Sequence, residues 1–348
     1  MPTTRRPDQP WHHSLTIDVF IKVLSHSVFH PFVAALVPLS LCAGGFPITA
    51  PAVWNTIYWA IFISIIHALA PLNERIAYGK RRKVDQEEEV MVITGGGSGL
   101  GRCLAETYAM KGGTVAVLDI HQPDVVDEAK DSIRYFDCDV TDVKKVEETW
   151  AMINKELGVP TVVINCAGIV HGKTGRDLST EEVTRSFAIN TVSHYTLNRL
   201  FINSAKDSPS GGTIVTVSSV LAKLGAAQLS AYAATKAALM AYHNSLTAEL
   251  TAYPNIKTIL VATGQLSTDM FAGLEPGPIE HFFGPTVEVS DLAVKIIKMV
   301  LGGRSGVIAE PAYARWISVM EILPVGIQQM LRRLVGVDKA MQSFRQKG

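Results

Sequence analysis

The feature that most constrains this fold is a run of 51 residues, 23–73, that contains no Asp, Glu, Lys or Arg. Charged residues make up 18% of the 348-residue chain, so an average segment of that length would carry several of them. The run is too long for the apolar core of a signal peptide, which is about 7–15 residues. It is also too long for one membrane-spanning helix, which needs about 20 residues. Residues 23–73 therefore predict a separate apolar unit ahead of the rest of the chain.

The apolar run divides into two limbs that suit a membrane-embedded hairpin. A glycine- and proline-rich interruption at residues 44–51 separates a limb at about 28–42 from one at about 52–70. As a helix, the second limb would be about 28 Å long, close to the roughly 30 Å hydrocarbon core of a bilayer. Lys22 precedes the run and a basic cluster at 80–83 follows it, so both flanks are expected on the cytosolic face. The hairpin either spans the bilayer twice or dips in and returns, and a buried hairpin of a soluble domain is the alternative.

The overall composition excludes several classes of protein. Lys plus Arg and Asp plus Glu are both 32, so the chain lacks the positive charge with which proteins attract nucleic acids. A hydrophobic content of 47% is too high for a disordered chain. The four cysteines form no CxxC pair and no metal-ligand spacing, which favours a reducing compartment over a disulfide scaffold. We therefore expect neither a nucleic-acid partner nor a metal site.

After residue 88, apolar runs and helical patterns alternate along the chain. Such alternation is typical of α/β folds in which a doubly wound parallel sheet is covered by helices on both faces. Ser179 and Glu182 have the spacing of a capping box at the start of one helix. Strands are expected near residues 90–93, 114–119, 133–137, 161–165, 213–218, 256–261 and 305–309. Helices are expected up to about residue 112 and near 141–156, 180–205, 230–252 and 289–301.

A glycine-rich loop follows the first expected strand. Residues 94–101 read TGGGSGLG and lie between that strand and a helical pattern. Glycines there allow a tight turn, and the helix N-terminus then presents N–H groups to a pyrophosphate. Asp119 ends the next strand 18 residues after Gly101, where an acid can accept hydrogen bonds from the adenosine ribose. Asp119 would repel a 2′-phosphate, and no Lys or Arg stands at positions 120 or 121, which favours NAD(H), with NADP(H) as the alternative.

A tyrosine and a lysine form the second functional signal. Tyr232 and Lys236 are four residues apart and therefore share one face of an expected helix. Ser219 follows the strand near 213–218, at the carboxyl edge of the sheet, where such folds bind ligands. Asn190 lies within the helix that precedes this strand.

The residue types fit the oxidation of an alcohol, which needs a base for the hydroxyl proton and an acceptor for the hydride. A free phenol titrates near pH 10, about 3 units above neutrality, and this difference corresponds to about 4 kcal/mol. One ammonium group at about 4 Å in an effective dielectric near 20 supplies about that much. Lys236 together with the positively charged nicotinamide is therefore expected to lower the pKa of Tyr232 far enough.

Taken together, these motifs resemble the short-chain dehydrogenase/reductase family over about residues 89–310. The apolar run and residues 312–316, Ala-Tyr-Ala-Arg-Trp, resemble one branch of it: the membrane-bound retinol and hydroxysteroid dehydrogenases of the endoplasmic reticulum and lipid droplets. Cys166 departs from the family's usual asparagine, and Thr263 departs from the proline that usually precedes Gly264. The family resemblance is based on TGGGSGLG, Cys138-Asp139-Val140, Asn165-Cys166-Ala167-Gly168, Asn190, Ser219 and Tyr232-x-x-x-Lys236.

The resemblance implies an α/β fold with a Rossmann-type doubly wound parallel sheet, and a role for each matched residue. Tyr232 would be the catalytic base or acid, and Lys236 would hold the nicotinamide ribose. Ser219 would bind the substrate oxygen. Asn190 would order a water that passes protons to Lys236, with a buried structural amide as the alternative. The residues implied to bind the cofactor are Gly95, Ser98, Gly99, Leu100, Gly101, Asp119, Asp139, Val140, Asn165, Ala167, Gly168, Tyr232, Lys236 and Thr268.

Two further segments indicate a lipophilic substrate. Residues 264–289 form a long, turn-rich segment, which is expected to be a lid over the site or part of the core. Its apolar residues are Leu266, Met270, Phe271, Leu274, Phe282 and Phe283. Apolar residues also recur at helical spacing over residues 313–327, and Arg332 and Arg333 follow. This pattern predicts an amphipathic segment at a membrane interface, or a helix packed on the sheet or on a second subunit.

The chain is therefore expected to be a membrane-anchored oxidoreductase that transfers a hydride between NAD(H) and a lipophilic alcohol or ketone, a retinoid, steroid or long-chain lipid. An NADP-dependent carbonyl reductase and a non-catalytic dinucleotide-binding lipid-droplet protein are the alternatives. The resemblance implies an endoplasmic reticulum or lipid-droplet location, a catalytic domain facing the cytosol, and a homodimer through the helices near 180–205 and 230–252. The expected parts are a tail (1–22), a hydrophobic hairpin (23–73), a charged linker (74–88), a dinucleotide-binding catalytic domain (89–310) and an amphipathic segment (311–348).

Overall fold

The computed structural model describes residues 15–122, 127–271 and 277–338. The chain divides into two compact units, Met1–Lys80 and Arg81–Gly348. The second unit thus begins at Arg81, within the stretch 74–88 that is expected to be a linker. The physical reason is a buried ion pair between Arg82 and Glu89, described below.

The first unit is helical and contains the predicted hairpin. Its helices are α1 (Ile17–His26), α2 (Pro31–Ala43) and α3 (Pro51–Tyr78), and α2 packs against α3. The indole N–H of Trp59 donates to the Val28 carbonyl at 3.0 Å, and the rings of Phe29 and Trp59 lie 5.4 Å apart. Proline stands at the first turn of both α2 and α3, where a missing N–H costs no helical hydrogen bond.

Helix α3 is longer than the predicted limb at 52–70. It has 28 residues and continues beyond the charge-free run to Tyr78. By length and composition α3 is apolar enough to cross a membrane, and α1 and α2 together pass the same test as a pair bent by 59°. Most of the apolar side chains of this unit are exposed, Phe32, Leu39 and Phe62 among them.

The second unit contains a seven-stranded sheet in the order β3-β2-β1-β4-β5-β6-β7. Every neighbouring pair is parallel, as the alternating pattern predicts. The strand order reverses between β1 and β4, so the connections leave in opposite directions and open a crevice at their carboxyl ends. The strands are β1 (Val90–Thr94), β2 (Thr114–Asp119), β3 (Ile133–Asp137), β4 (Val162–Asn165), β5 (Gly212–Ser219), β6 (Ile256–Thr263) and β7 (Gly306–Glu310).

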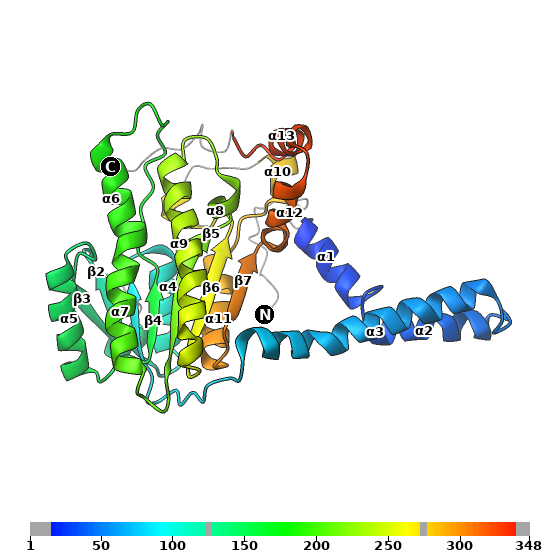
Figure 1. The fold of residues 1–348 in the computed structure, drawn as a ribbon, viewed down its shortest axis with the longest axis horizontal. Coiled ribbons are helices and arrows are strands. Elements are labelled where there is room, and N and C mark those ends of the chain that lie inside the picture. The colour runs from blue at the N-terminus through cyan, green and yellow to red at the C-terminus, as the bar shows by residue number, and fades with distance from the viewer. Residues whose placement is uncertain (1–14, 123–126, 272–276, 339–348) are drawn as a thin grey trace. The chain divides into compact units, whose positions relative to one another are not determined.

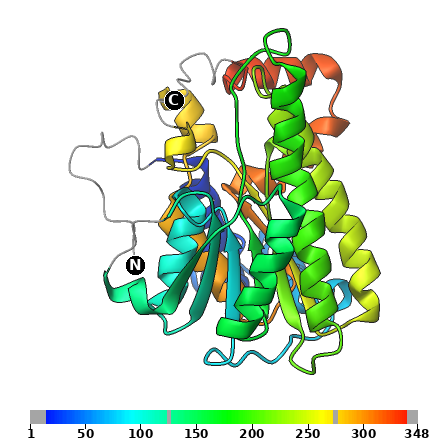
Figure 2. The ribbon, with the colours of Figure 1, turned by 90° about the vertical axis from the view of Figure 1, so that its left-hand side faces the viewer.

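Helices cover both faces of the sheet, and each face has its own core (Figure 1). Leu104 of α4 and Ile296 of α11 lie in the core on one face. Trp150 of α5, Phe201 of α7 and Leu246 of α9 lie in the core on the other. Figure 2 shows the strands between the two helical layers. The longer helices are α4 (Gly99–Ala109), α5 (Val143–Glu156), α6 (Thr180–Phe187), α7 (Ser193–Ala205), α9 (Ser230–Glu249) and α11 (Val289–Leu301).

Shorter elements surround the carboxyl edge of the sheet. They are α8 (Leu221–Leu224), η5 (Asp269–Phe271), α10 (Pro278–Phe283), η6 (Ala312–Arg315), α12 (Ile317–Ile322) and α13 (Val325–Leu334). The single helix predicted near 180–205 is interrupted by one π-helical turn, η3 (Ala188–Val192). The remaining 3₁₀ turns are η2 (Asp127–Ser132) and η4 (Leu250–Ala252).

A buried ion pair ties the start of the second unit to the amino edge of the sheet. Arg82 Nη1 donates to Glu89 Oε1 at 2.8 Å, and Arg82 Nη2 donates to Glu89 Oε2 at 2.5 Å. Arg82 Nε donates to the hydroxyl of Thr213, and the hydroxyl of Thr161 donates to Glu89. The backbone N–H of Arg82 also donates to the Gly303 carbonyl at 2.9 Å. Residues 82–89 therefore belong to the folded domain.

Candidate active site

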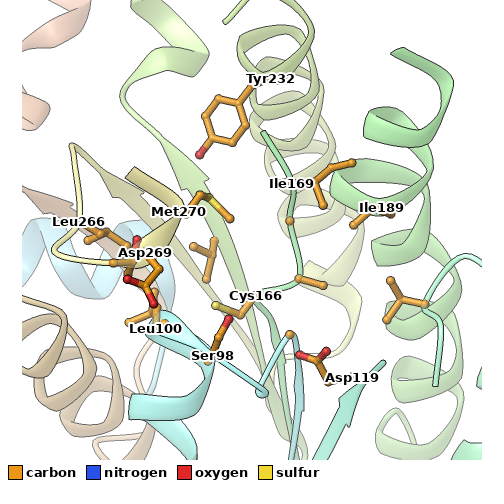
Figure 3. A pocket seen from close by; sticks show the side chains of 18 of the residues that line it. Ser98, Leu100, Asp119, Cys166, Ile169, Ile189, Tyr232, Leu266, Asp269 and Met270 are labelled. Atoms are coloured by element: carbon orange, nitrogen blue, oxygen red, sulfur yellow. The ribbon is translucent and has the colours of Figure 1, made fainter. Parts of the chain in front are cut away.

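A cavity of about 330 Å³ lies at the carboxyl ends of β1, β2, β4, β5 and β6. Figure 3 shows its side chains, with Asp119 at one end and Tyr232 at the other. Most of the predicted site residues line it: Gly95, Ser98, Gly99, Leu100, Gly101, Asp119, Asp139, Val140, Ala167, Gly168, Tyr232, Lys236 and Thr268. The structure therefore brings together both groups of motifs, although they are more than 100 residues apart in the sequence.

Two glycines of the glycine loop lie so close to neighbouring backbone atoms that a side chain would not fit there. A Cβ on Gly95, which has φ +69°, would lie 2.7 Å from the Cα of Ala167. A Cβ on Gly101 would lie 2.2 Å from the Gly95 carbonyl oxygen. Helix α4 begins at Gly99, so its free N–H groups lie at the cavity, where a helix N-terminus favours an anion. This wall fits the pyrophosphate of a dinucleotide.

Asp119 is held in a fixed orientation at the end of β2. Its Oδ2 accepts from the Gly97 N–H at 2.8 Å, and its Oδ1 accepts from the His121 N–H at 3.0 Å. A carboxylate has about four lone-pair positions, so acceptor capacity remains for ribose hydroxyls. Ile120 beside it is exposed and brings no positive charge. The geometry therefore fits an unphosphorylated adenosine ribose.

Asn165 and Thr268 have different positions with respect to the cavity. Asn165 is 1% exposed and does not line the cavity, because its amide turns away and donates to Asn198 at 2.9 Å. Its side chain is thus engaged within the protein, and its contact with the cofactor stays a prediction. Thr268 does line the wall, and a Cβ on Gly99 would lie 3.3 Å from its methyl group.

Burial sets the ionisation of Tyr232 and Lys236, both on α9. Burial raises the pKa of Tyr232 to about 12, and hydrogen bonding with the Ser219 side chain offsets only part of this rise. Burial also lowers the pKa of Lys236 to about 8. Lys236 Nζ lies 5.6 Å from the centre of the Tyr232 ring and donates to the Val217 carbonyl at 2.8 Å. Desolvation of the phenolate is therefore the largest effect on the Tyr232 pKa in this structure, and the lowering expected from Lys236 together with a bound nicotinamide stays a prediction.

Ser219 and Asn190 lie in the layer behind the cavity. Ser219 ends β5, and its hydroxyl donates to the Thr263 carbonyl and accepts from the Leu221 N–H, each at 3.2 Å. Asn190 lies in the π-helical turn, fully buried, and exchanges two hydrogen bonds with the backbone of Ile169. Neither residue lines the cavity itself.

Asn190 and Lys236 both lie close to Gly168. A Cβ on Gly168 would lie 3.5 Å from Asn190 Oδ1 and 3.8 Å from Lys236 Nζ. The amide of Asn190 also donates to the Thr235 hydroxyl at 3.1 Å. Asn190 thus has the contacts of a structural amide and lies next to Lys236, so the geometry is compatible with both interpretations of this residue.

The wall around Tyr232 is mostly apolar. Ile169 faces it from the loop after β4, and Leu266 and Met270 come from the segment after β6 (Figure 3). The Phe271 ring meets the Tyr232 ring edge to face, 6.4 Å apart. The predicted lid thus contributes to the wall over the described residues, while Leu274 lies outside them.

The remaining predicted lid residues have another position. Phe282 and Phe283 stack on each other in α10, 5.0 Å apart, and do not line the cavity.

Several lining residues are not among the predicted site residues. Cys166, Ile169 and Arg185 are examples. Cys166 departs from the family pattern, and burial raises the pKa of its thiol to about 12, so little of the reactive thiolate forms at neutral pH. The only feature of the sequence that could have identified Ile169 as a cavity residue is its position directly after Asn165-Cys166-Ala167-Gly168.

Comparisons with known proteins agree with this geometry. The model of the short chain dehydrogenase family matches residues 89–278, which is more than half of the chain. The chain belongs to the short-chain dehydrogenase family. It is therefore an oxidoreductase that acts on CH–OH groups with NAD or NADP.

The relatives include members of the retinol and hydroxysteroid dehydrogenase branch of this family. The chain is 30% identical to the uncharacterized oxidoreductase TDA5 of Saccharomyces cerevisiae, with 72% of this chain and 76% of the relative aligned. It is 25% identical to 17-beta-hydroxysteroid dehydrogenase 13 of Homo sapiens, with 80% and 93% aligned. It is 27% identical to retinol dehydrogenase 10-B of Danio rerio, with 76% and 86% aligned.

A solved structure supports the fold. The 3-ketoacyl-(acyl-carrier-protein) reductase of Brucella melitensis, in complex with NADH, matches with a TM-score of 0.56 at 23% identity. The match covers 64% of this chain and 96% of that one. Over the described residues, no group of three or more His, Cys, Asp or Glu side chains has the geometry of a metal site.

Proposed function

We propose that this protein is a membrane-anchored oxidoreductase that transfers a hydride between NAD(H) and a lipophilic alcohol or ketone. The observation that carries the proposal is the position of Tyr232, which shares one cavity with the glycine loop, with Lys236 and with an apolar wall. A polar reacting group at Tyr232 and an apolar substrate body along Ile169, Met270 and Phe271 would both be accommodated there.

The chain's own residues supply the proton in this reaction. With a pKa of about 12, the Tyr232 phenol is protonated at neutral pH and can donate to the oxygen of a ketone as the carbonyl is reduced. Ser219 would hydrogen-bond the same oxygen, and protonated Lys236 would stabilise the charge left on Tyr232. Asn190 fixes the backbone of Ile169 and would order the path by which a proton returns to Lys236. A nicotinamide bound in the cavity supplies the hydride, or accepts it in the oxidative direction.

Asp119 supports NAD(H) over NADP(H) as the cofactor. Its carboxylate is fixed at the ribose end of the cavity by the N–H groups of Gly97 and His121. A 2′-phosphate there would lie against a negative charge, with no described Lys or Arg adjacent in sequence to offset it. Asp119→Ser should reduce kcat/KM with NADH and raise it with NADPH, and measurement of both values for both proteins tests this choice.

Membrane attachment and a lipid substrate are supported by the exposed apolar surface. In the first unit α3 is long and apolar enough to cross a bilayer. In the second unit Trp316, Ile322, Val325 and Met330 of the segment from η6 to α13 are each more than 60% exposed. Such a surface suits a bilayer or droplet interface. Two relatives are named for retinol and for a hydroxysteroid, which supports a retinoid or a steroid as substrate, with a long-chain lipid as a further candidate. The proposed location, the endoplasmic reticulum or a lipid droplet, is based on the exposed apolar surface.

A homodimer through α7 and α9 is part of the proposal. Tyr195 of α7 is 52% exposed and stacks on Tyr242 of α9, with ring centres 3.9 Å apart. The two helices thus present an aromatic surface on the outside of the sheet. Light scattering of the detergent-solubilised protein, compared with Tyr195→Glu, tests whether this surface joins two copies.

Membranes that contain the full-length protein test the activity, with Tyr232→Phe membranes as the blank. Retinol, hydroxysteroids and long-chain alcohols are offered with NAD⁺ or NADP⁺, and the carbonyl product is followed by mass spectrometry. Removal of a general acid or base should lower turnover by about 10²–10⁴-fold. Cofactor binding should be nearly unchanged. Retained turnover in Tyr232→Phe would contradict the role of this residue, and NAD binding without any product would favour a non-catalytic surface protein.

A further inference from the structure

A second, much smaller cavity lies beside Tyr232. Its volume is about 10 Å³, which is about the space of one water-sized group. Tyr232 is the residue that lines both this cavity and the large one. The loop after β4 also connects them, because Ile169 lines the large cavity and His171 lines the small one. Gln228, on the loop before α9, also lines the small cavity.

His171 has a buried ring nitrogen that has no partner. Its Nε2 is inaccessible to solvent and makes no hydrogen bond. A buried polar atom without a partner costs free energy, and such an atom in a native fold calls for a ligand or a water. Because His171 lines the small cavity, an oxygen atom placed there can satisfy this nitrogen.

The other ring nitrogen faces a fixed carboxylate. His171 Nδ1 lies 3.8 Å from Glu182 Oε1. The Glu182 side chain is held by Lys173 Nζ and by the backbone N–H of Ser179, which completes the capping box predicted for α6. These two contacts also hold the pKa of Glu182 below its usual value, so its charge persists at neutral pH. A negative charge beside Nδ1 favours the proton on that nitrogen, which leaves Nε2 of the neutral ring as an acceptor toward the cavity.

Gln228 has an unusual backbone conformation at the same cavity. Among the described residues it is the one non-glycine residue with a positive φ, +64°. Glycine would fit this conformation better, so glutamine at this position points to a use for the side chain. Its amide can donate a hydrogen bond to an oxygen that in turn donates to His171.

We infer that the small cavity is a subsite for a hydroxyl group of the substrate, bound between His171 and Gln228. A hydroxyl donates to Nε2 and accepts from the amide, whereas a carbonyl or ether oxygen only accepts. Since Tyr232 borders both cavities, the proposal places this hydroxyl on a carbon next to the one that reacts. The inference rests on the proposed function and narrows its substrate to lipids with a hydroxyl beside the reacting carbonyl, such as 2-ketones hydroxylated at carbon 1.

The experiment compares two ketones of equal chain length, 2-dodecanone and 1-hydroxy-2-dodecanone, with NADH and full-length protein in membranes. Two hydrogen bonds to the hydroxyl should give the hydroxyketone at least about a tenfold advantage in kcat/KM. His171→Leu should abolish this advantage by raising KM for the hydroxyketone alone. His171→Gln, which keeps an acceptor, should restore part of it. Gln228→Gly relieves the backbone conformation and should still lose part of the advantage.

Three results would overturn the inference. The first is an equal kcat/KM for the two ketones in the unmodified protein. The second is an equal loss of kcat/KM for both ketones in His171→Leu. The third is an advantage of the hydroxyketone that both Gln228→Gly and His171→Leu leave unchanged. Binding of the two ketones to the Tyr232→Phe variant separates this inference from the proposed function. The change in fluorescence of bound NADH measures this binding. Stronger binding of the hydroxyketone that depends on His171 supports the subsite even without turnover, and equal binding contradicts it even where turnover is observed.

Discussion

Burial shifts the pKa values of Tyr232 and Lys236 in opposite directions, and both groups still carry their protons at neutral pH. Burial disfavours the charged form of each group, so the pKa of the phenol rises to about 12 and that of the ammonium falls to about 8. The site therefore holds its protons in the form that carbonyl reduction needs. The titration that falls within an accessible pH range belongs to Lys236.

The pH dependence of carbonyl reduction should follow Lys236. Below pH 8 Lys236 is charged and kcat/KM for NADH should be constant; above pH 8 it loses its proton and kcat/KM should fall. Tyr232 stays protonated until about pH 12 and should add no second decrease before then. Steady-state kinetics from pH 6 to pH 10 measure this profile. Lys236→Arg keeps its charge throughout and should react more slowly but without the break. A break near pH 8 in that variant would show that another group titrates.

The site residues that could be predicted from the sequence are those that no other residue type could replace, because of either the space around the backbone or the chemistry of the side chain. Gly95 and Gly101 have no room for a Cβ, and Tyr232 is a proton donor, so each is recognisable from the sequence. Ile169 lines the same cavity, but any apolar residue would serve there. The pKa of Tyr232 could not be predicted either, because the sequence does not give the depth of burial or the distance to Lys236.

At the scale of elements, the glycine loop packs against the loop that follows β4, and two glycine substitutions test this contact. Gly95 and Gly112 both have positive φ, +69° and +84°. A Cβ on Gly95 would lie 2.7 Å from Ala167, whereas nothing lies within 4 Å of a Cβ on Gly112. Gly112→Ala should therefore cost only the left-handed conformation, about 1–2 kcal/mol. Gly95→Ala should cost a further 1–3 kcal/mol from overpacking and should abolish NAD binding.

Urea unfolding and NADH fluorescence titration of the two variants measure these effects. Equal NAD binding by Gly95→Ala and Gly112→Ala would mean that the contact with Ala167 relaxes without closing the cavity.

The strands could be predicted because each is a short apolar run bounded by turns, and all seven occur close to their expected positions. Interruptions within helices could not be predicted. The π-helical turn around Asn190 depends on the hydrogen bonds between Asn190 and Ile169, which are distant in sequence. The extension of α3 to Tyr78 was missed for a related reason, since the prediction followed apolar residues and the last turns of α3 are polar.

At the scale of the whole molecule, the domain boundary depends on the Arg82–Glu89 ion pair. Both side chains are buried, and each also bonds to a threonine of the sheet edge. Arg82→Met would leave the Glu89 carboxylate buried without its partner and should destabilise residues 81–348 by about 3–5 kcal/mol. Arg81→Met changes an exposed neighbour and should have an effect within about 0.5 kcal/mol. Urea unfolding of residues 81–348 measures both, and a similar small effect for both variants would place the boundary after Glu89.

The hairpin of the first unit should enter the membrane and return on the same side. Helix α2 has 13 residues and rises about 20 Å, which is less than the roughly 30 Å of the hydrocarbon core. Cys42, exposed at the end of α2, should therefore lie within the bilayer. Permeant and impermeant maleimides should both fail to label Cys42 in intact and in opened microsomes, because a maleimide reacts with the thiolate, a charged form that hydrocarbon disfavours, and both should label it after the membrane is dissolved in detergent. Cys42→Ser gives the background from the other cysteines, which are partly or fully buried. Labelling of Cys42 by the impermeant reagent only after the microsomes are opened would instead require that the hairpin spans the membrane twice.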